Sequence, residues 1–251
     1  MTEIDTLPAR TPLREDGATA LAVGAHPDDM ECGAAAAVAR WTAQGKRVVY
    51  CMVTSGEAGI DGMDPDEARR VREAEEVESA RIVGVDEVAR RAPPDGGPAH
   101  GLRRRRAPAG AIRRHRPDGV ITGNYRETFP GGMLNQADHV ATGRAVVDAV
   151  RDAGNRWVFR EQVESDGIEP WGGVRQVWVA ASPDARHGVD VSATFDAGVA
   201  SLRAHAAYLD GLGWEDFDPA AFLASMSAPT GERMGVEHAV AFELLLMNGE
   251  D

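Results

Sequence analysis

The sequence is short of cysteine and of long apolar runs, and each shortage excludes a class of protein. Two cysteines in 251 residues are too few for a disulfide framework, which fits a reducing compartment. No apolar stretch approaches the ~18 residues that a membrane-spanning helix needs. The polar N-terminal residues lack the apolar core of a signal peptide. We therefore expect a cytoplasmic protein without membrane insertion.

Positive charge is also in deficit. The formal net charge of -13 makes nucleic acid and anionic membrane surfaces unsuitable as general partners. The arginine run over residues 103–106 is a local exception, but no aromatic residues interleave with it. This run favours a solvated helix face or a subunit contact, and a homo-oligomer is compatible with it.

Short apolar runs that alternate with helical stretches are the main pattern. Runs that predict strands cover residues 20–25, 47–53, 120–122, 176–181 and 189–191, and stretches that predict helices cover 30–44, 65–83, the arginine-rich segment to about 116, 138–151 and 194–212. Residues 235–247 are compatible with either. The alternation predicts an α/β fold, a single Rossmann-like domain with a mostly parallel sheet and helices on both faces. We expect a flexible tail over residues 1–18 and the domain over 19–251.

An imidazole and two carboxylates directly follow the first predicted strand, in the segment His26-Pro27-Asp28-Asp29. Ligands bind at this edge of open α/β sheets. His26 and Asp29 can hold one metal ion while Asp28 stays free to accept a proton. Both aspartates also suit N-capping of the next helix. Capping alone, however, needs neither the imidazole nor the second carboxylate.

Asp138-His139 lies after a glycine-rich loop, at the start of a later predicted helix. The strand before it should run parallel to the first strand, which brings the two loops together. His139 could then complete a three-ligand site with His26 and Asp29, leaving a position for water as in catalytic zinc sites. A solvent-facing histidine at a helix start is the alternative.

The segment Ala25-His26-Pro27-Asp28-Asp29-Met30-Glu31 resembles the AHPDDxE signature of the zinc-dependent de-N-acetylases of the PIG-L or LmbE-like family. Further similar segments are Thr54-Ser55-Gly56-Glu57, Arg72-Glu73-Ala74-Glu75 and Val189-Asp190-Val191-Ser192, so the resemblance covers most of the chain. It implies one Zn²⁺ per chain, held by His26, Asp29 and His139. It also implies that Asp28 is the general base and that Asp138 orients a histidine.

The implied reaction is hydrolysis of an N-acetyl or other N-acyl group from a small amino-sugar conjugate, in secondary-metabolite or thiol-cofactor metabolism. One position departs from the family pattern. The family usually has a histidine three residues before the last ligand, where this chain has Gln136. The glutamine amide can donate a hydrogen bond to an oxyanion but cannot deliver a proton. This difference motivates an alternative, a sugar-binding protein that retains zinc with weak or lost hydrolysis.

Four further residues are candidates for substrate binding: Arg72, Asp95, Asn124 and His205. Arg72 could instead belong to a solvated helix face. Asp95 stands between proline and glycine, where aspartate commonly forms turns. Cys32 follows the acidic motif, and we interpret it as a small buried residue.

Overall fold

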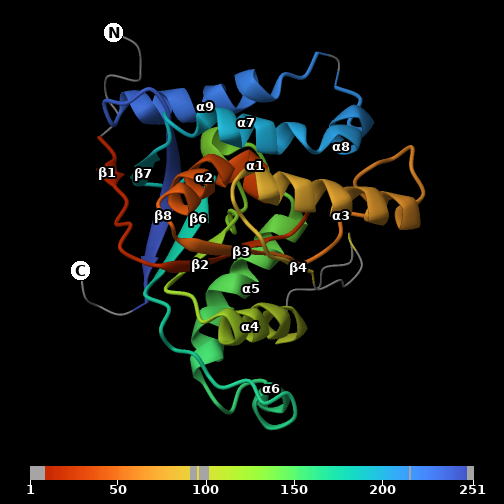
Figure 1. Cartoon of the computed structure of the whole chain (residues 1–251), viewed down its shortest axis with the longest axis vertical. Helices are drawn as coiled ribbons and strands as arrows, with labels where there is room; N and C mark the ends of the chain where they lie inside the picture. The colour runs from red at the N-terminus through yellow and green to blue at the C-terminus, as the bar shows by residue number, and fades with distance from the viewer. Residues whose placement is uncertain (1–8, 91–94, 96–101, 215, 248–251) are drawn as a thin grey trace.

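In the computed structural model, which describes residues 9–90, 95, 102–214 and 216–247, eight strands form one central sheet (Figure 1). Its order is β1-β7-β8-β6-β5-β2-β3-β4, and among these described strands β8 alone runs antiparallel to its neighbours. The strands are β1 (Thr11–Pro12), β2 (Thr19–Gly24), β3 (Arg47–Met52), β4 (Val88–Arg90), β5 (Gly119–Thr122), β6 (Gln176–Ala180), β7 (His187–Asp190) and β8 (Ala239–Leu246).

Helices cover both faces of the sheet, which confirms the predicted fold class. One face carries α1 (Asp29–Gly33), α2 (Ala35–Ala43), α3 (Pro65–Ile82), α7 (Phe195–Arg203), α8 (Ala206–Gly211) and α9 (Pro219–Glu232) (Figure 1). The other carries α4 (Leu102–His115), α5 (Ala137–Gly154) and α6 (Arg160–Glu164). No helix among the described residues is long and apolar enough to cross a membrane.

The central strand β2 shows why two helical layers are needed. Ala22 packs into the core cluster that contains Trp41 of α2, whereas Leu21 and Val23 pack into a second cluster with Ile112 of α4. Successive side chains of a strand point to opposite faces. A strand that is apolar at every position must therefore be covered on both sides.

The N-terminal segment corrects one prediction. Residues 9–18 do not form a flexible tail, because Thr11–Pro12 pairs with β7 and Leu13 is only 5% exposed. The backbone N–H of Leu13 donates to the carbonyl of Gly188 at 2.9 Å. Its partners lie far along the chain, so no local pattern reveals the pairing. Residues 1–8 lie outside the described residues.

Two predicted helices are each divided. The stretch 30–44 breaks at Ala34, which has φ of −138°, and the stretch 194–212 breaks between Arg203 and Ala206.

The ambiguous C-terminal run becomes strand β8 because it fills the space between β6 and β7. The sequence analysis did not anticipate β4, α6 or α9. The neighbours of Asp95 in the turn suggested for it lie outside the described residues.

Candidate functional site

Three potential metal ligands meet at the carboxyl ends of β2 and β5. His26 comes from the connection between β2 and α1, Asp29 is the first residue of α1, and His139 lies in the first turn of α5. Their candidate ligand atoms all lie within 4.8 Å of one another. Oδ1 of Asp29 is 3.1 Å from Nε2 of His139 and 3.9 Å from Nδ1 of His26. Two imidazoles and one carboxylate are ligands that zinc accepts, so this set fits a divalent metal ion.

Each imidazole is oriented by a polar group on its far side. Nε2 of His26 lies 3.0 Å from Oδ1 of Asp95 and 3.3 Å from Oδ2 of Asp138. Carboxylates in this position fix the ring and raise the basicity of the other nitrogen. Asp138 thus lies where a residue that orients a histidine must lie. His26 with Asp95 and Asp138 also forms a second possible metal-binding group.

Asn135 plays the corresponding part for His139. Its Oδ1 lies 3.1 Å from Nδ1 of His139. The orientation of the amide is defined, because its nitrogen donates to the carbonyls of Asn124 and Arg126 at 2.8 and 2.9 Å. An amide oxygen only accepts, so Nδ1 of His139 carries a proton and donates it to Asn135, and Nε2 is the ring nitrogen that faces Asp29. Sequence analysis missed Asn135 because an asparagine in a glycine-rich loop is typical of a turn.

Opposite charges hold this cluster together. Burial alone would lower the pKa of His26. Its hydrogen bonds with Asp29 and Asp95, together with the negative charges of these two carboxylates, raise the pKa to about 11. Burial alone would raise the pKa of Asp29, but His139 and His26 hold it well below its ordinary range. The buried carboxylates therefore favour positive charge at this position, which a metal cation also provides.

The carboxylate of Asp28 is held next to the cluster by a strained backbone and two buried partners. Asp28 has φ of 93°, a left-handed conformation that non-glycine residues rarely adopt. Its N–H donates to Oε2 of Glu76 at 3.3 Å, and its Oδ1 accepts from the guanidinium of Arg72. Burial raises the pKa of Asp28 to about 6; the charge of Asp29 adds to this effect, and that of Arg72 opposes it.

Arg72 and His205, two of the candidates for substrate binding, are buried and do not line the cavity described below. Arg72 is 2% exposed and donates to the carbonyl of Gly56 at 2.9 Å, while its guanidinium stacks 3.8 Å from the ring centre of Tyr208. A Cβ at Gly56, where φ is 63°, would collide with that guanidinium. The charged pattern of α3 suggested a solvated face, but Arg72 points inward.

His205 is fully buried. Its Nε2 lies 3.6 Å from Glu31 and 3.7 Å from Glu76, and these three residues form a further group within metal-binding distance of one another. Glu31 also accepts from the hydroxyl of Ser79. The predicted substrate contact at His205 is therefore replaced by a buried ionic network beneath Asp28.

The remaining predicted site residues are divided between the site and the surface. Asp95 has only 7% of its side chain exposed and packs against His26. Asn124 lines the cavity described below. Gln136 is exposed, precedes α5 and does not line that cavity, so it lies away from the position expected of an oxyanion donor. It faces solvent because the inward position is occupied by Asn135.

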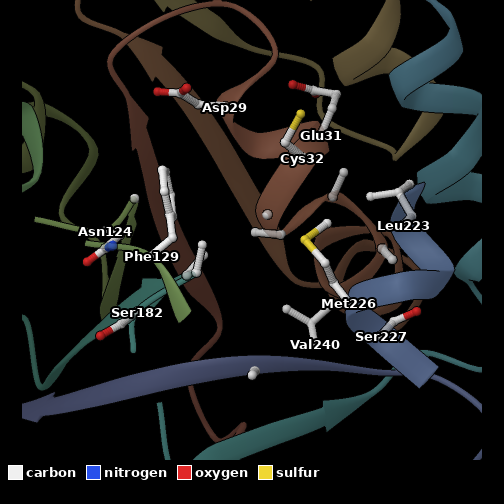
Figure 2. Close-up of a pocket in the computed structure, with 18 of the residues that line it drawn as sticks. Asp29, Glu31, Cys32, Asn124, Phe129, Ser182, Leu223, Met226, Ser227 and Val240 are labelled. Atoms are coloured by element: carbon white, nitrogen blue, oxygen red, sulfur yellow. The ribbon is translucent and has the colours of Figure 1, made fainter. Parts of the chain in front are cut away.

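A cavity of about 640 Å³ opens onto the cluster and is lined in part by Asp28, Asp29 and His139. Figure 2 shows Asp29 and Glu31 at one end and Met226 and Val240 toward the other. Alanine, valine, leucine, methionine, phenylalanine, glycine and proline make up most of its lining residues. The candidate metal ligands therefore lie at the end of a largely apolar cavity.

Solved structures share this fold. N,N'-diacetylchitobiose deacetylase from Pyrococcus horikoshii superimposes with a TM-score of 0.83 at 22% identity, covering 92% of this chain and 85% of that one. The conserved protein TT1542 from Thermus thermophilus gives 0.73 at 27% identity, covering 92% and 96%. The 4-carboxy-2-hydroxymuconate hydratase GalB from Pseudomonas putida KT2440 gives 0.72 at 16% identity, covering 93% and 98%. The fold thus supports more than one reaction.

Sequence comparisons are more specific. The uncharacterized deacetylase YaiS from Escherichia coli strain K12 is 44% identical over 43 residues, which are 17% of this chain and 23% of that protein. The match therefore spans about a quarter of the curated relative. The family model described as PIG-L, GlcNAc-PI de-N-acetylase, matches residues 21–150, which include His26, Asp28, Asp29 and His139. The chain therefore belongs to the PIG-L family of de-N-acetylases.

Proposed function

We propose that this protein is a zinc-dependent N-deacylase that hydrolyses the amide of a small N-acylated amino-sugar conjugate. The observation that carries the proposal is the convergence of His26, Asp29 and His139 within 4.8 Å, at the mouth of a cavity. Membership of a de-N-acetylase family supports the reaction class. The similarity in fold to a deacetylase of diacetylchitobiose supports an amino-sugar substrate.

His26, Asp29 and His139 would hold one Zn²⁺. When bound, the ion supplies Lewis acidity to the amide carbonyl and makes a water molecule more acidic. Asp95, Asp138 and Asn135 orient the two imidazoles through their second nitrogens. These three residues hold the ligands and do not take part in proton transfer.

Asp28 would accept the proton from the attacking water. Hydrolysis forms a bond from the water oxygen to the carbonyl carbon, breaks the C–N bond and leaves a carboxylic acid and an amine. The amine nitrogen needs one proton, and Gln136 faces solvent and cannot supply it. We therefore assign both proton transfers to the carboxyl group of Asp28, which Arg72 and Glu76 hold in position.

Release of amine and carboxylate from N-acetylglucosamine and its glycosides tests the proposal. We expect equimolar products, loss of turnover on chelation and recovery with Zn²⁺. Asp28→Asn should lower kcat by about a hundredfold to ten-thousandfold with unchanged zinc content. The proposed function would be overturned if the fully zinc-loaded protein released neither product from N-acetylglucosamine or any of the glycosides tested.

A sugar-binding protein that retains zinc is the second candidate. The exposed side chain of Gln136 favours it, since the imidazole usual at this position in the family is missing. Calorimetry with glucosamine and N-acetylglucosamine distinguishes the two. Tight binding of an amino sugar without any turnover supports the binding protein, and turnover excludes it.

A further inference from the structure

The cavity beside the candidate metal ligands is bounded on its far side by elements from the C-terminal part of the chain. Beyond Asp29 and His139 it extends along Gly33–Ala36 of α1 and α2 and along Ala180 and Ala181 at the end of β6. Leu223 and Met226 of α9 and Val240 of β8 form the far wall (Figure 2). The glycine and alanine residues of α1, α2 and β6 leave space because their side chains are small. The larger apolar side chains of α9 and β8 form the boundary of this space on the other side.

The neutral polar side chains on these walls already have partners within the protein, whereas Nε of Arg10 and Oε2 of Glu31, which also line the cavity, have no hydrogen-bond partner among the described residues. Backbone carbonyls accept from the hydroxyls of Thr122, Ser225 and Thr230. Side chains are the partners of three others: Ser182 donates to Glu243, Ser227 pairs with His238, and Thr142 accepts from Arg104. Asn124 uses the nitrogen and the oxygen of its amide within its own loop. Sugar hydroxyls that lost water here would find few free partners, and unpaired buried polar groups are costly. An apolar group pays no such penalty.

The position of the cavity decides which part of the substrate enters it. The amide carbonyl must lie at Asp29 and His139, so the acyl group and the amino sugar extend in different directions from that point. The sugar needs hydrogen-bond partners, and the side chains of the cavity walls offer few that are free. The acyl group is therefore the part that matches the cavity walls.

We propose that the cavity between α1, α9 and β8 binds a medium-length alkyl chain, so that the preferred substrate amide carries an acyl group longer than acetyl. This inference rests on the proposed N-deacylase function. Each methylene that is buried on binding should increase affinity by roughly threefold to fourfold. A cavity of 640 Å³ lies within the range of sites that enclose a whole small-molecule ligand.

Binding to the metal-free protein tests the cavity independently of catalysis. Calorimetry should give at least about a hundredfold higher affinity for N-octanoylglucosamine than for N-acetylglucosamine, with a negative heat-capacity change. Octyl N-acetylglucosaminide, which carries an eight-carbon chain on its anomeric oxygen and only an acetyl group on its nitrogen, should gain nothing comparable. Equal affinities for N-octanoylglucosamine and N-acetylglucosamine would overturn the proposal that the cavity binds the acyl group. A gain in affinity confined to the octyl glycoside would also overturn it.

A pair of variants on one strand locates the site. Val240→Asp places a carboxylate in the far wall and should remove most of the preference for the octanoyl compound. Leu246→Asp adds the same charge at a residue of β8 that is 43% exposed and does not line the cavity, and the preference should remain. Circular dichroism and thermal unfolding verify that both variants fold. An unchanged preference in folded Val240→Asp contradicts the proposal.

Turnover by the zinc-loaded protein separates this inference from the proposed function. We expect kcat/KM to rise along the acetyl, butyryl, hexanoyl and octanoyl series. Hydrolysis of the acetyl compound without any increase along the series would overturn the acyl site alone. Selective octanoyl binding without hydrolysis of any member would support the acyl site and overturn the N-deacylase assignment.

Discussion

Oδ1 of Asn135 accepts a hydrogen bond from Nδ1 of His139 at 3.1 Å and so directs the other ring nitrogen toward Asp29. The asparagine itself does not reach the metal position. Its amide nitrogen is fixed by two carbonyls of the loop after β5. The loop that precedes α5 therefore determines the direction of a ligand that α5 carries.

Asn135→Ala should weaken zinc binding by about tenfold to a hundredfold, because His139 loses the partner that fixes its tautomer and its ring. Competition with a chromophoric chelator measures the affinity. Asn155→Ala, at an exposed asparagine that also accepts a backbone N–H, is the matched control. Equal zinc affinity in wild type and Asn135→Ala would show that the contact has no orienting role.

Arg72→Met should raise the pKa of Asp28 above its value of about 6, because the guanidinium opposes the effect of burial on that carboxyl. In the turnover assay, the acidic limb of the pH profile of kcat/KM should move to higher pH. Arg70→Met, at an exposed position of the same helix, should leave the profile unchanged. An unshifted acidic limb in Arg72→Met would contradict this role.

The same pair predicts a coupling in stability. Arg72→Met leaves the buried carboxylate of Asp28 without its cation and should cost about 3 to 5 kcal/mol. Adding Asp28→Asn removes the unpaired charge, so the double variant should be more stable than Arg72→Met alone. Urea unfolding of the four proteins in this cycle measures the interaction. Additive effects would mean that the pair is not coupled.

His205→Leu should destabilise the protein more at pH 6 than at pH 9. Burial alone would lower the pKa of His205, but Glu31 and the neighbouring acidic groups raise it. A histidine whose pKa is raised in the folded state contributes its full stabilisation at pH values below its unfolded pKa of about 6.5. This contribution is lost as pH rises through the pKa of the folded state. Urea unfolding at both pH values measures the difference.

His187→Leu provides the control of opposite sign. Burial lowers the pKa of His187, so its contribution becomes more favourable as pH rises through the unfolded value. The two histidine variants should therefore change stability in opposite directions with pH. Parallel pH dependence in both would contradict the assigned environments.

Asp118→Asn should loosen the attachment of the N-terminal segment above pH 4. Oδ2 of Asp118 accepts from the backbone N–H groups of Ala18 and Thr19 at 2.9 and 3.0 Å. Burial tends to raise the pKa of Asp118, but these hydrogen bonds lower it overall. The stabilisation from the ionised Asp118 is fully present at pH values above the pKa of this group in the unfolded chain. It is lost as pH falls through the pKa of Asp118 in the folded state.

Hydrogen exchange at the amides of Ala18 and Thr19 measures this effect. Exchange should be faster in Asp118→Asn than in wild type at neutral pH, and the difference should shrink in acid. Asp16→Asn, which alters an exposed acidic group of the same segment, serves as the control. Equal protection in wild type and Asp118→Asn at neutral pH would contradict the prediction.

The local sequence determined the elements whose information lies within a few residues. The apolar run 20–25 and the alternating charges of 65–83 each predict their element, because periodicity and capping act over one or two turns. The spacing of His26, Asp28 and Asp29 places them in one strand-to-helix connection for the same reason. The pairing with His139 followed from the expectation that parallel strands end at a common edge and from the resemblance to the PIG-L family.

The tertiary structure decided everything that depends on contacts between distant segments. It buried Arg72 and His205, which were candidates for substrate binding, and turned Gln136 outward while Asn135 turned inward. It also placed α9 and β8 across from Asp29, which created the apolar cavity between them. The direction in which a side chain points, and the neighbours that it meets, depend on how the layers pack, and no local pattern contains that information.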